Sequence, residues 1–435
     1  MKNTIICSIA VLSAALLAAC TETTRIWPEE GESKAYVEVS SEKVIFDADG
    51  GNAVIAVATN ADGWDYAAEG DWFTVARQDG NALLVETLIN AGAETLTGKL
   101  TVSAEKNGET VSQEVALVQR AERSVNLSAE GTANCYIART GGVYKFDASI
   151  KGNGGGDGVS DYIANYGLAI DDGAFAELLW ESRHDGDKTM SREIIDGAPI
   201  YRGGYVTFST GRSEGNAVIA VKDIKGNIVW SWHIWVCNDE ITAHDHIDSE
   251  GEVAAVIMDR NLGALNNTPM DVGNRGMFYE WGRKDPFTPS RSPYHADTDG
   301  DNVPAYNEPN TAIGDGTGTW VHDAQAAVLA TPPANIPNSI QNPMTYLQSP
   351  YNGHADWYCT GTDSKATHPG LWGPEKTIFD PCPPGYKVPG PDLWGIPAGN
   401  NSITNGGAVA DYDETGVSPK WDWNVYEDCG RRWKN

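Results

Sequence analysis

The chain has 435 residues, with 60 acidic and 31 basic side chains and a formal net charge of -29 at pH 7. Its length is sufficient for about two to four domains, each able to bury its own core. A surface with such an excess of negative charge repels phosphate backbones, so the composition argues against nucleic acid as a partner.

The first 20 residues have the pattern of a signal peptide. Lys2 precedes an apolar run from Ile5 to Ala19 that is too short for a stable membrane span. The run ends in the sequence LAAC, which resembles the lipobox of bacterial lipoproteins, where the cysteine is acylated and becomes the mature N-terminus. The resemblance implies that Cys20 is a lipid attachment point. Because Thr21 and not aspartate follows, we expect an anchor in the outer membrane, on its periplasmic face or at the cell surface.

Residues 21–35 are polar, acidic and aperiodic, which predicts a tether. Residues 36–121 then contain short β-rich segments such as YVEVS, KLTVSA and SQEVALVQ, separated by turn sequences such as DADGGN and EKNGE. This spacing of strands and turns is typical of an all-β sandwich.

Residues 36–121 contain the pair Gly50-Gly51, Trp64, the sequence DWFTV around Trp72, the sequence GKLTVSA and the closing Gln119. Together these features resemble a BACON domain, an immunoglobulin-like module of gut Bacteroidetes proteins. The resemblance implies a module that binds carbohydrate or mucin, or one that acts only as a spacer. Trp64 and Trp72 are candidate sugar-stacking residues, although a tryptophan in a small sandwich is more often part of the core.

Residues 122–238 form another β-rich block, for which we predict a second β-sandwich. The segments ANCYIART and GVYKFDASIKGNG are expected to be paired strands around the Gly141-Gly142 turn. The segment AVIAVKDIKGNIVWSWHIWV is expected to be a hairpin across Lys225, Gly226 and Asn227. A third segment, DDGAFAELLWESR, fits either a short helix or a strand.

The last strand of this block carries aromatic side chains on both faces. By the period of two, one face holds Trp230, Trp232, Ile234 and Val236, and the other holds Val229, Ser231, His233 and Trp235. A strand with two such faces is expected to be central and buried in its sheet. We therefore predict that His233 is a hydrogen-bonded core residue and not a catalyst.

Five cysteines remain after the signal segment and Cys20: Cys135, Cys237, Cys359, Cys382 and Cys429. The expected compartment permits disulfides, but five cysteines cannot all pair within the chain. Cys135 and Cys237 lie in strand-like stretches of one block and are candidates for a bridge, and Cys382 is able to pair with Cys359 or Cys429. No CxxC sequence occurs, so a zinc site made of thiolates is not expected.

From about residue 239 the sequence becomes irregular, aromatic and rich in proline. The sequences VIMDRNLGALNN, GNRGMFYEWGRKDPF and TIFDPCPPGYKVPGPDLW occur in this order, and between Val256 and about Trp394 they resemble the fimbrillin-associated FISUMP family of bacterial surface lipoproteins. The resemblance implies an irregular α+β module, related to the C-type-lectin-like fold, over residues 239–435. The family pattern has further strands after the CPPGY sequence, so we expect the module to be incomplete at CGRRWKN.

The sequence FYEWGRKDPF, at 278–287, combines aromatic rings with charges of both signs. Asp285 precedes a proline, which favours an extended backbone and a turn. Arg283 and Lys284 are able to pair with Glu280 or Asp285, so we predict a structural charge cluster and not a catalytic dyad. The aromatic residues are otherwise expected to be mostly core, and Trp281 and Arg283 are the two residues that we expect to reach a ligand if the module is complete.

The sequence DTDGDNVPAYNEP spaces its acids like a calcium loop. Asp297, Asp299, Asp301 and Glu308 occupy positions 1, 3, 5 and 12. The sixth position is asparagine instead of glycine and no helices are expected beside it, which argues against an EF-hand. A simpler calcium loop and a solvated acidic turn both remain open, and no other cofactor is expected.

These observations predict a mainly β fold: an immunoglobulin-like β-sandwich, a second β-sandwich, and an irregular α+β C-type-lectin-like module. No GxSxG or HExxH sequence occurs, so we expect no enzymatic activity. The expected function is carbohydrate (glycan or mucin) binding or adhesion by a lipid-anchored cell-envelope protein. One alternative is a structural fimbrillin-like or scaffold subunit that assembles with other surface-protein subunits and binds no sugar. A polysaccharide-processing enzyme is a third alternative, which the sequence disfavours.

Overall fold

The computed structural model describes residues 34–78, 81–155, 162–183, 193–247, 253–268, 272–274, 276–287, 305–307, 311–312, 325–327, 334–348, 371–373 and 375–389. Within these ranges the fold is mainly β, which confirms the predicted class. The strands form sheets of four, six and eight strands and two small two-stranded sheets. The helices in this part of the chain are all too short or too polar to span a bilayer.

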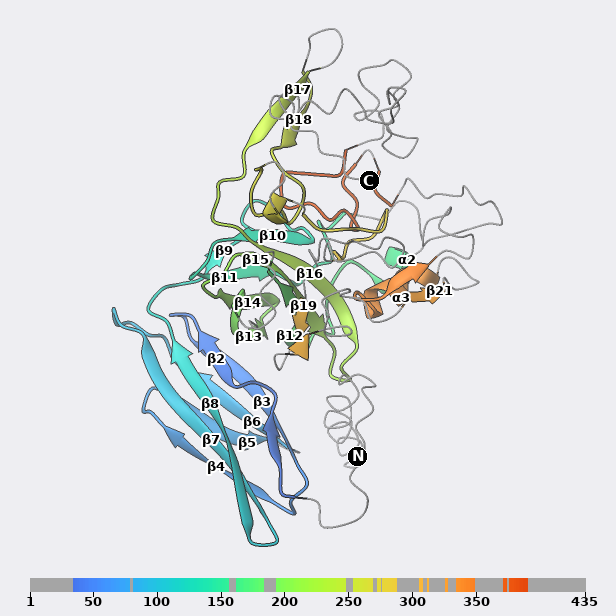
Figure 1. Cartoon of the computed structure of the whole chain (residues 1–435). Helices are drawn as coiled ribbons and strands as arrows, with labels where there is room; N and C mark the ends of the chain where they lie inside the picture. The colour runs from blue at the N-terminus through green and yellow to red at the C-terminus, as the bar shows by residue number, and fades with distance from the viewer. Residues whose placement is uncertain are drawn as a thin grey trace.

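The first unit is a β-sandwich (Figure 1). Its strands are β1 (Val37–Val39), β2 (Lys43–Phe46), β3 (Gly51–Thr59), β4 (Trp64–Glu69), β5 (Phe73–Gln78), β6 (Ala82–Thr87), β7 (Leu96–Lys106) and β8 (Glu109–Gln119). One sheet has the order β1-β3-β6-β5, and the other contains β4-β7-β8-β2. Alternate residues of β7 point inward, so that Leu100, Val102 and Ala104 are buried against the opposite sheet.

The second unit also has two layers. Its elements are β9 (Val125–Asn126), β10 (Cys135–Ala138), β11 (Val143–Asp147), α2 (Tyr162–Tyr166), β12 (Phe175–Ser182), β13 (Ile195–Arg202), β14 (Tyr205–Thr210), β15 (Gly215–Lys222) and β16 (Ile228–Val236). One layer has the order β13-β14-β11-β9, and the other has β10-β16-β15-β12. The segment that fitted either a helix or a strand is therefore the strand β12.

The predicted hairpin across residues 225–227 is confirmed, because β15 and β16 pair in antiparallel register. The expected pairing of the strands around Gly141 and Gly142 is wrong. β10 pairs in parallel with β16, whereas β11 pairs with β14 and β9 in the other sheet. The turn at Gly141, which has a φ of +74°, therefore carries the chain from one layer to the other. The alternation of side chains along each strand fits a pairing of β10 with β11 as well as their placement in different sheets. The sequence therefore does not reveal this change of sheet.

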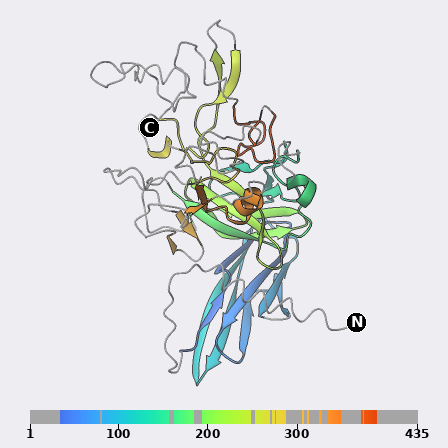
Figure 2. The ribbon, with the colours of Figure 1, turned by 90° about the vertical axis from the view of Figure 1, so that its right-hand side faces the viewer.

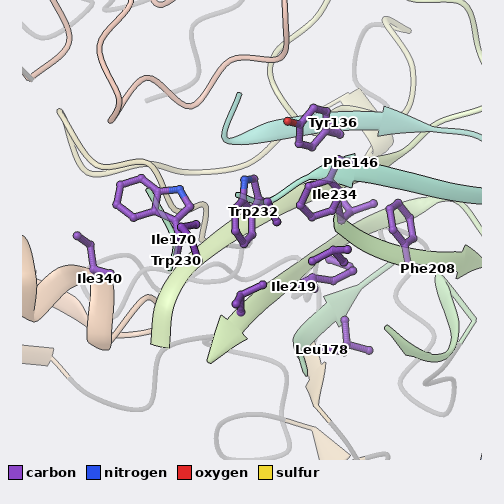
Figure 3. Close-up of a cluster of buried hydrophobic side chains, with 14 of the residues drawn as sticks. Tyr136, Phe146, Ile170, Leu178, Phe208, Ile219, Trp230, Trp232, Ile234 and Ile340 are labelled. Carbon is purple, nitrogen blue, oxygen red and sulfur yellow. The ribbon is translucent and has the colours of Figure 1, made fainter. Parts of the chain in front are cut away.

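β16 is central and buried on both faces, as its sequence predicts. Figure 3 shows Trp230, Trp232 and Ile234 in the core between the layers, with Phe146 and Phe208 nearby. The opposite face carries Ser231, His233 and Trp235, which are also buried. Because both faces of β16 are buried, another part of the chain must pack on the side of its sheet that faces away from this core.

The two units share one continuous sheet. β2 pairs in parallel with β13 at Val44 and Ala198, which gives the order β4-β7-β8-β2-β13-β14-β11-β9. Beside this contact Lys43 Nζ lies 2.6 Å from Asp196 Oδ1. Gly197 has a φ of +78°, and a Cβ there would lie 3.3 Å from the carbonyl oxygen of Lys43. Glycine therefore permits the backbone conformation at this junction.

The remaining described elements are β17 (Ala243–Ile247), β18 (Val253–Met258), η1 (Val272–Asn274), β19 (Ala305–Asn307), β20 (Thr311–Ala312), β21 (Gln325–Ala327), α3 (Asn335–Gln341) and β22 (Tyr346–Gln348). The β17–β18 hairpin lies at the end of the molecule away from the first unit (Figures 1 and 2). β19 extends the six-stranded sheet by pairing with β12. The core of the second unit also includes later side chains, namely Ile336, Ile340, Leu347, Leu371, Ile378 and Phe379.

The bridge that the sequence left open between Cys135 and Cys237 is not formed, because both thiols are free and buried. Cys135 pairs with His233 in the register of β10 and β16, and Cys237 lies four residues further along the chain. At a rise of about 3.3 Å per residue, the two cysteines are roughly 13 Å apart along the strands, which is too far for a disulfide. Cys382 is buried, and its two candidate partners, Cys359 and Cys429, lie outside the described residues.

We predict that Asn134→Ala destabilises the second unit. The buried Asn134 side chain donates to the carbonyl oxygens of Ile378, at 2.7 Å, and Asp380, at 2.8 Å, and it accepts the Trp230 indole N–H at 2.8 Å. Alanine leaves these buried groups unpaired, so we expect a loss of about 3 kcal/mol in the free energy of unfolding, measured in urea. The exposed Asn165→Ala is the control and should change this value by less than about 0.5 kcal/mol. Equal effects of the two changes would contradict the prediction.

Candidate functional site

The FYEWGRKDPF sequence forms a closed loop on the outer face of the six-stranded sheet. The backbones of Phe278 and Phe287 exchange two hydrogen bonds, at 2.8 and 2.7 Å, which close the loop at its ends. The Arg283 amide donates to the Glu280 carbonyl, at 2.9 Å, and makes a turn in its middle. At Gly282 φ is +85°, and a Cβ would lie 2.7 Å from that of Leu371. The loop therefore requires a glycine here for both its conformation and its packing.

The predicted structural charge cluster is confirmed, and it consists of two ion pairs. Arg283 pairs with Glu280, and both side chains are buried. The guanidinium also donates to the carbonyl oxygens of Thr345, at 2.6 Å, and Asn342, at 2.7 Å. Glu280 accepts the amide N–H of Leu347 at 2.9 Å. The pair thus fastens the loop to the segment between α3 and β22.

The second ion pair fastens the loop to β16. Lys284 Nζ lies 2.7 Å from Asp285 Oδ1 and donates to Ser231 Oγ at 2.5 Å. Ser231 Oγ in turn donates to Asp285 Oδ1 at 2.6 Å. The ammonium group also lies 4.6 Å from the ring centroid of Trp230. Both charges are therefore compensated within the interior, which makes them structural groups.

Trp281 lies on the outside of the same loop, with 39% of its surface exposed. Its ring centroid is 5.0 Å from that of Trp372, with the two rings inclined at 59°. The Trp372 indole N–H donates to the Phe379 carbonyl at 2.9 Å, which fixes the second ring. Together the rings line a pocket of about 270 Å³, hereafter the Trp281 pocket, whose other lining residues are Asn261, Leu262, Met277, Tyr279, Pro381 and Val388.

A chain of hydrogen bonds runs from the Trp281 pocket into the sheet. The Tyr279 hydroxyl lies 3.2 Å from His233 Nδ1, and His233 Nε2 lies 2.8 Å from Asn216 Oδ1. Asn216 Nδ2 donates to the Gly263 carbonyl at 2.9 Å, so its oxygen faces the histidine as an acceptor. This assigns the His233 proton to Nε2 and makes Tyr279 the donor to Nδ1. Burial raises the pKa of Tyr279, which keeps this hydroxyl protonated. The prediction of a hydrogen-bonded core histidine is confirmed.

The two tryptophans of the first unit lie far along the chain from this pocket and have different environments. Trp64 is buried, its indole N–H donates to Asn81 Oδ1 at 3.0 Å, and the Arg77 guanidinium lies 4.0 Å from its ring centroid. The core interpretation of Trp64 is therefore confirmed. Trp72 is half-buried against the core, and its indole N–H donates to the Thr97 carbonyl at 3.1 Å.

The structure corrects the expectation that Arg283 reaches a ligand. Its side chain is only 1% exposed, because the guanidinium satisfies Glu280 and the backbone carbonyls beneath the loop. Conversely, sequence reasoning missed Trp372 as the partner of Trp281. It lies only a few residues before the TIFDPCPPGY sequence, but nothing local indicates which ring it meets.

The candidate calcium ligands Asp297, Asp299, Asp301 and Glu308 lie outside the described residues, as does the lipid attachment point Cys20. Among the residues that the structure describes, no group of three or more His, Cys, Asp or Glu side chains is arranged to hold a metal ion.

No protein-family model matches the chain, and no curated protein matches it. Among solved structures, a chimeric titin Z1Z2 protein is similar at 11% identity, over 47% of this chain and 97% of its own, with a TM-score of 0.17. The β-glucuronidase of Parabacteroides merdae is similar at 14% identity, over 47% of this chain and 24% of its own, with a TM-score of 0.16. An endo-fucoidan hydrolase of glycoside hydrolase family 107 is similar at 13% identity, over 47% and 35%, with a TM-score of 0.18. Scores this low carry no functional argument.

We predict that Glu280 makes stability depend on pH. Burial raises its pKa from the ordinary value of 4.5 to about 7, against the opposing effect of Arg283. Between these values the unfolded chain releases this proton while the folded chain retains it, so Glu280 contacts Arg283 as an uncharged acid in this range and as an ion pair above about pH 7. The contribution of Glu280 is therefore fully present below about pH 4.5 and is lost as the pH rises to about 7.

The test compares the urea unfolding free energies of the wild type and Glu280→Gln between pH 4.5 and 7.5. The stability advantage of the wild type should shrink as the pH rises, by up to about 1.4 kcal/mol per pH unit. The exposed Glu109→Gln serves as the control and should show no such trend. An advantage that grows with pH would show that pairing with Arg283 outweighs burial.

Proposed function

We propose that this chain is a lipid-anchored cell-envelope protein that binds carbohydrate at the Trp281 pocket. The observation that carries the proposal is the exposed Trp281 ring beside the fixed Trp372 ring, at the mouth of a pocket of about 270 Å³. The C–H faces of a sugar ring pack on aromatic faces, and polar groups orient its hydroxyls. The exposed Asn261 is such a polar group on the rim.

The lining of this pocket suits binding better than hydrolysis. Glycoside hydrolysis requires two carboxyl groups placed on either side of the scissile bond. The described lining residues include neither aspartate nor glutamate. The nearby acids Glu280 and Asp285 are buried in ion pairs with Arg283 and Lys284. Neither of these two acids lines the pocket.

Three resemblances in the sequence support the same proposal. The LAAC sequence at Cys20 supports a lipid anchor in the outer membrane. The features between residues 36 and 121 support a BACON-type module, and the three motifs between Val256 and Trp394 support a FISUMP-type module. Both kinds of module occur in surface proteins, which is where adhesion to glycan or mucin takes place.

A structural role is the second candidate, and the junction between the units favours it. The eight-stranded sheet crosses from the first unit to the second, and the Lys43–Asp196 ion pair lies beside the crossing. Backbone pairing of β2 with β13 and this ion pair connect the two sandwiches directly, as a spacer or fimbrillin-like subunit requires. In this case the chain would assemble with other subunits and have no glycan affinity.

We predict that Trp281→Ala weakens glycan binding by about tenfold or more, because it removes one aromatic face of the pocket. The measurement is a glycan array with the chain from Thr21 onward, followed by titration calorimetry with the glycan that gives the strongest signal. Phe278→Ala is the matched control, since Phe278 is 56% exposed in the same loop but does not line the pocket.

Two results would refute carbohydrate binding at this site. One is the absence of any signal on host, plant and mucin glycans, and the other is equal loss of binding in the Trp281→Ala and Phe278→Ala proteins. Concentration-dependent assembly of a chain without glycan affinity, followed by light scattering, would instead support the structural role.

A further inference from the structure

A second pocket lies where the first and second units meet, far along the chain from Trp281. It has a volume of about 430 Å³. Arg120, directly after β8, lines it from the first unit. The second unit contributes Glu193, Asp196 and Arg212, together with backbone at Gly141 and Gly211. A pocket of this volume is within the usual range for small-molecule ligands.

The two acids that line this junction pocket are already neutralised. Asp196 accepts both of its hydrogen bonds from Lys43 Nζ, at 2.6 and 2.8 Å. Glu193 pairs with Arg183 at 2.9 Å and also with Arg212. The hydrogen bond from Arg212 is the main reason that the pKa of Glu193 is lowered, so this acid stays ionised and paired.

Arg120 has no such partner. No ion pair or hydrogen bond joins its guanidinium to another described residue, and its Nε–H is buried without an acceptor. A buried donor without a partner is rare, and it is commonly explained by a water, an ion or a ligand. The pocket therefore has in its wall a permanently charged guanidinium that pairs with no acid of the described residues.

The wall of the junction pocket does not share the acidic excess of the whole chain. Acids outnumber bases 60 to 31 over the full sequence. In the wall of the junction pocket, two cations, Arg120 and Arg212, lie with two acids, Glu193 and Asp196. Arg212, Arg183 and Lys43 already pair with these acids, so Arg120 is the cation of the wall that has no acid of the described residues beside it.

We propose that the junction pocket binds an oxyanion through the Arg120 guanidinium, either the carboxylate of an acidic sugar such as a uronate or a free anion. The planar fork of arginine donates two parallel hydrogen bonds to a carboxylate or a sulfate. Nε is buried, whereas the two terminal Nη groups are not, so a bound oxyanion meets the guanidinium end-on at its Nη groups. The ligand contacts both units and holds them together.

The test titrates the chain with sodium glucuronate, glucose and sodium sulfate by calorimetry at low and high salt. Glucuronate should bind, glucose should not, and the affinity should fall as the salt concentration rises. Arg120→Gln should reduce the affinity by at least about tenfold, because it removes the charged donor. Arg123→Gln is the matched control, since Arg123 is three residues away, exposed and paired with Asp49 at 3.2 Å.

Binding of both glucuronate and sulfate, lost together in Arg120→Gln, supports an oxyanion site that accepts free anions. Binding of glucuronate alone supports an acidic sugar as the ligand. Equal binding of glucose and glucuronate, no binding of either anion, or an equal effect of Arg120→Gln and Arg123→Gln overturns the proposal. Circular dichroism confirms that both variants are folded. Trp281→Ala should leave this binding unchanged, which separates the junction pocket from the Trp281 pocket.

Discussion

The double burial of β16 is the constraint on which the second unit and the Trp281 pocket depend. On one face, Trp230 and Trp232 complete the core between two sheets. On the other face, Ser231 and His233 are polar and equally buried, so each needs a partner inside the protein. Ser231 obtains it from Lys284 and Asp285, and His233 from Asn216 and Tyr279. Hydrogen bonding therefore determines which segment can cover this face of β16 as much as hydrophobic contact does.

The same requirement explains the shape of the Trp281 pocket. The charged residues of the 278–287 loop point inward because β16 and the α3–β22 segment offer them partners. Trp281 lies between these anchors and remains outside. Trp281 is therefore flanked by buried, hydrogen-bonded residues although most of the loop has no regular secondary structure. A preorganised aromatic face loses little entropy on binding, which is an advantage for a weakly interacting ligand such as a sugar.

Patterns within one strand were sufficient for correct predictions. Pairings between distant segments could not be predicted from such patterns. The alternation along Trp230 to Val236 gave both faces of β16 and the core role of His233. The neighbouring charges of the 278–287 loop gave its ion pairs, but not that Arg283 is buried, because the carbonyls it binds come from residues 342–345. The partnership of Trp281 with Trp372 and the separation of β10 from β11 depend in the same way on tertiary contacts that no local period encodes.

The hydrogen bonds of Asn134 join residues 244 and 246 positions apart in the chain. In a chain that emerges with its N-terminus first, the first unit has all its strands once Gln119 has emerged, so it can fold early from contacts that are close in sequence. The second unit must wait until residues 371–380 are available, and until then the tryptophans of β16 lack part of their cover. The order in which the chain emerges thus separates the folding of the two units in time, and the later unit is the more exposed to aggregation and to chaperones.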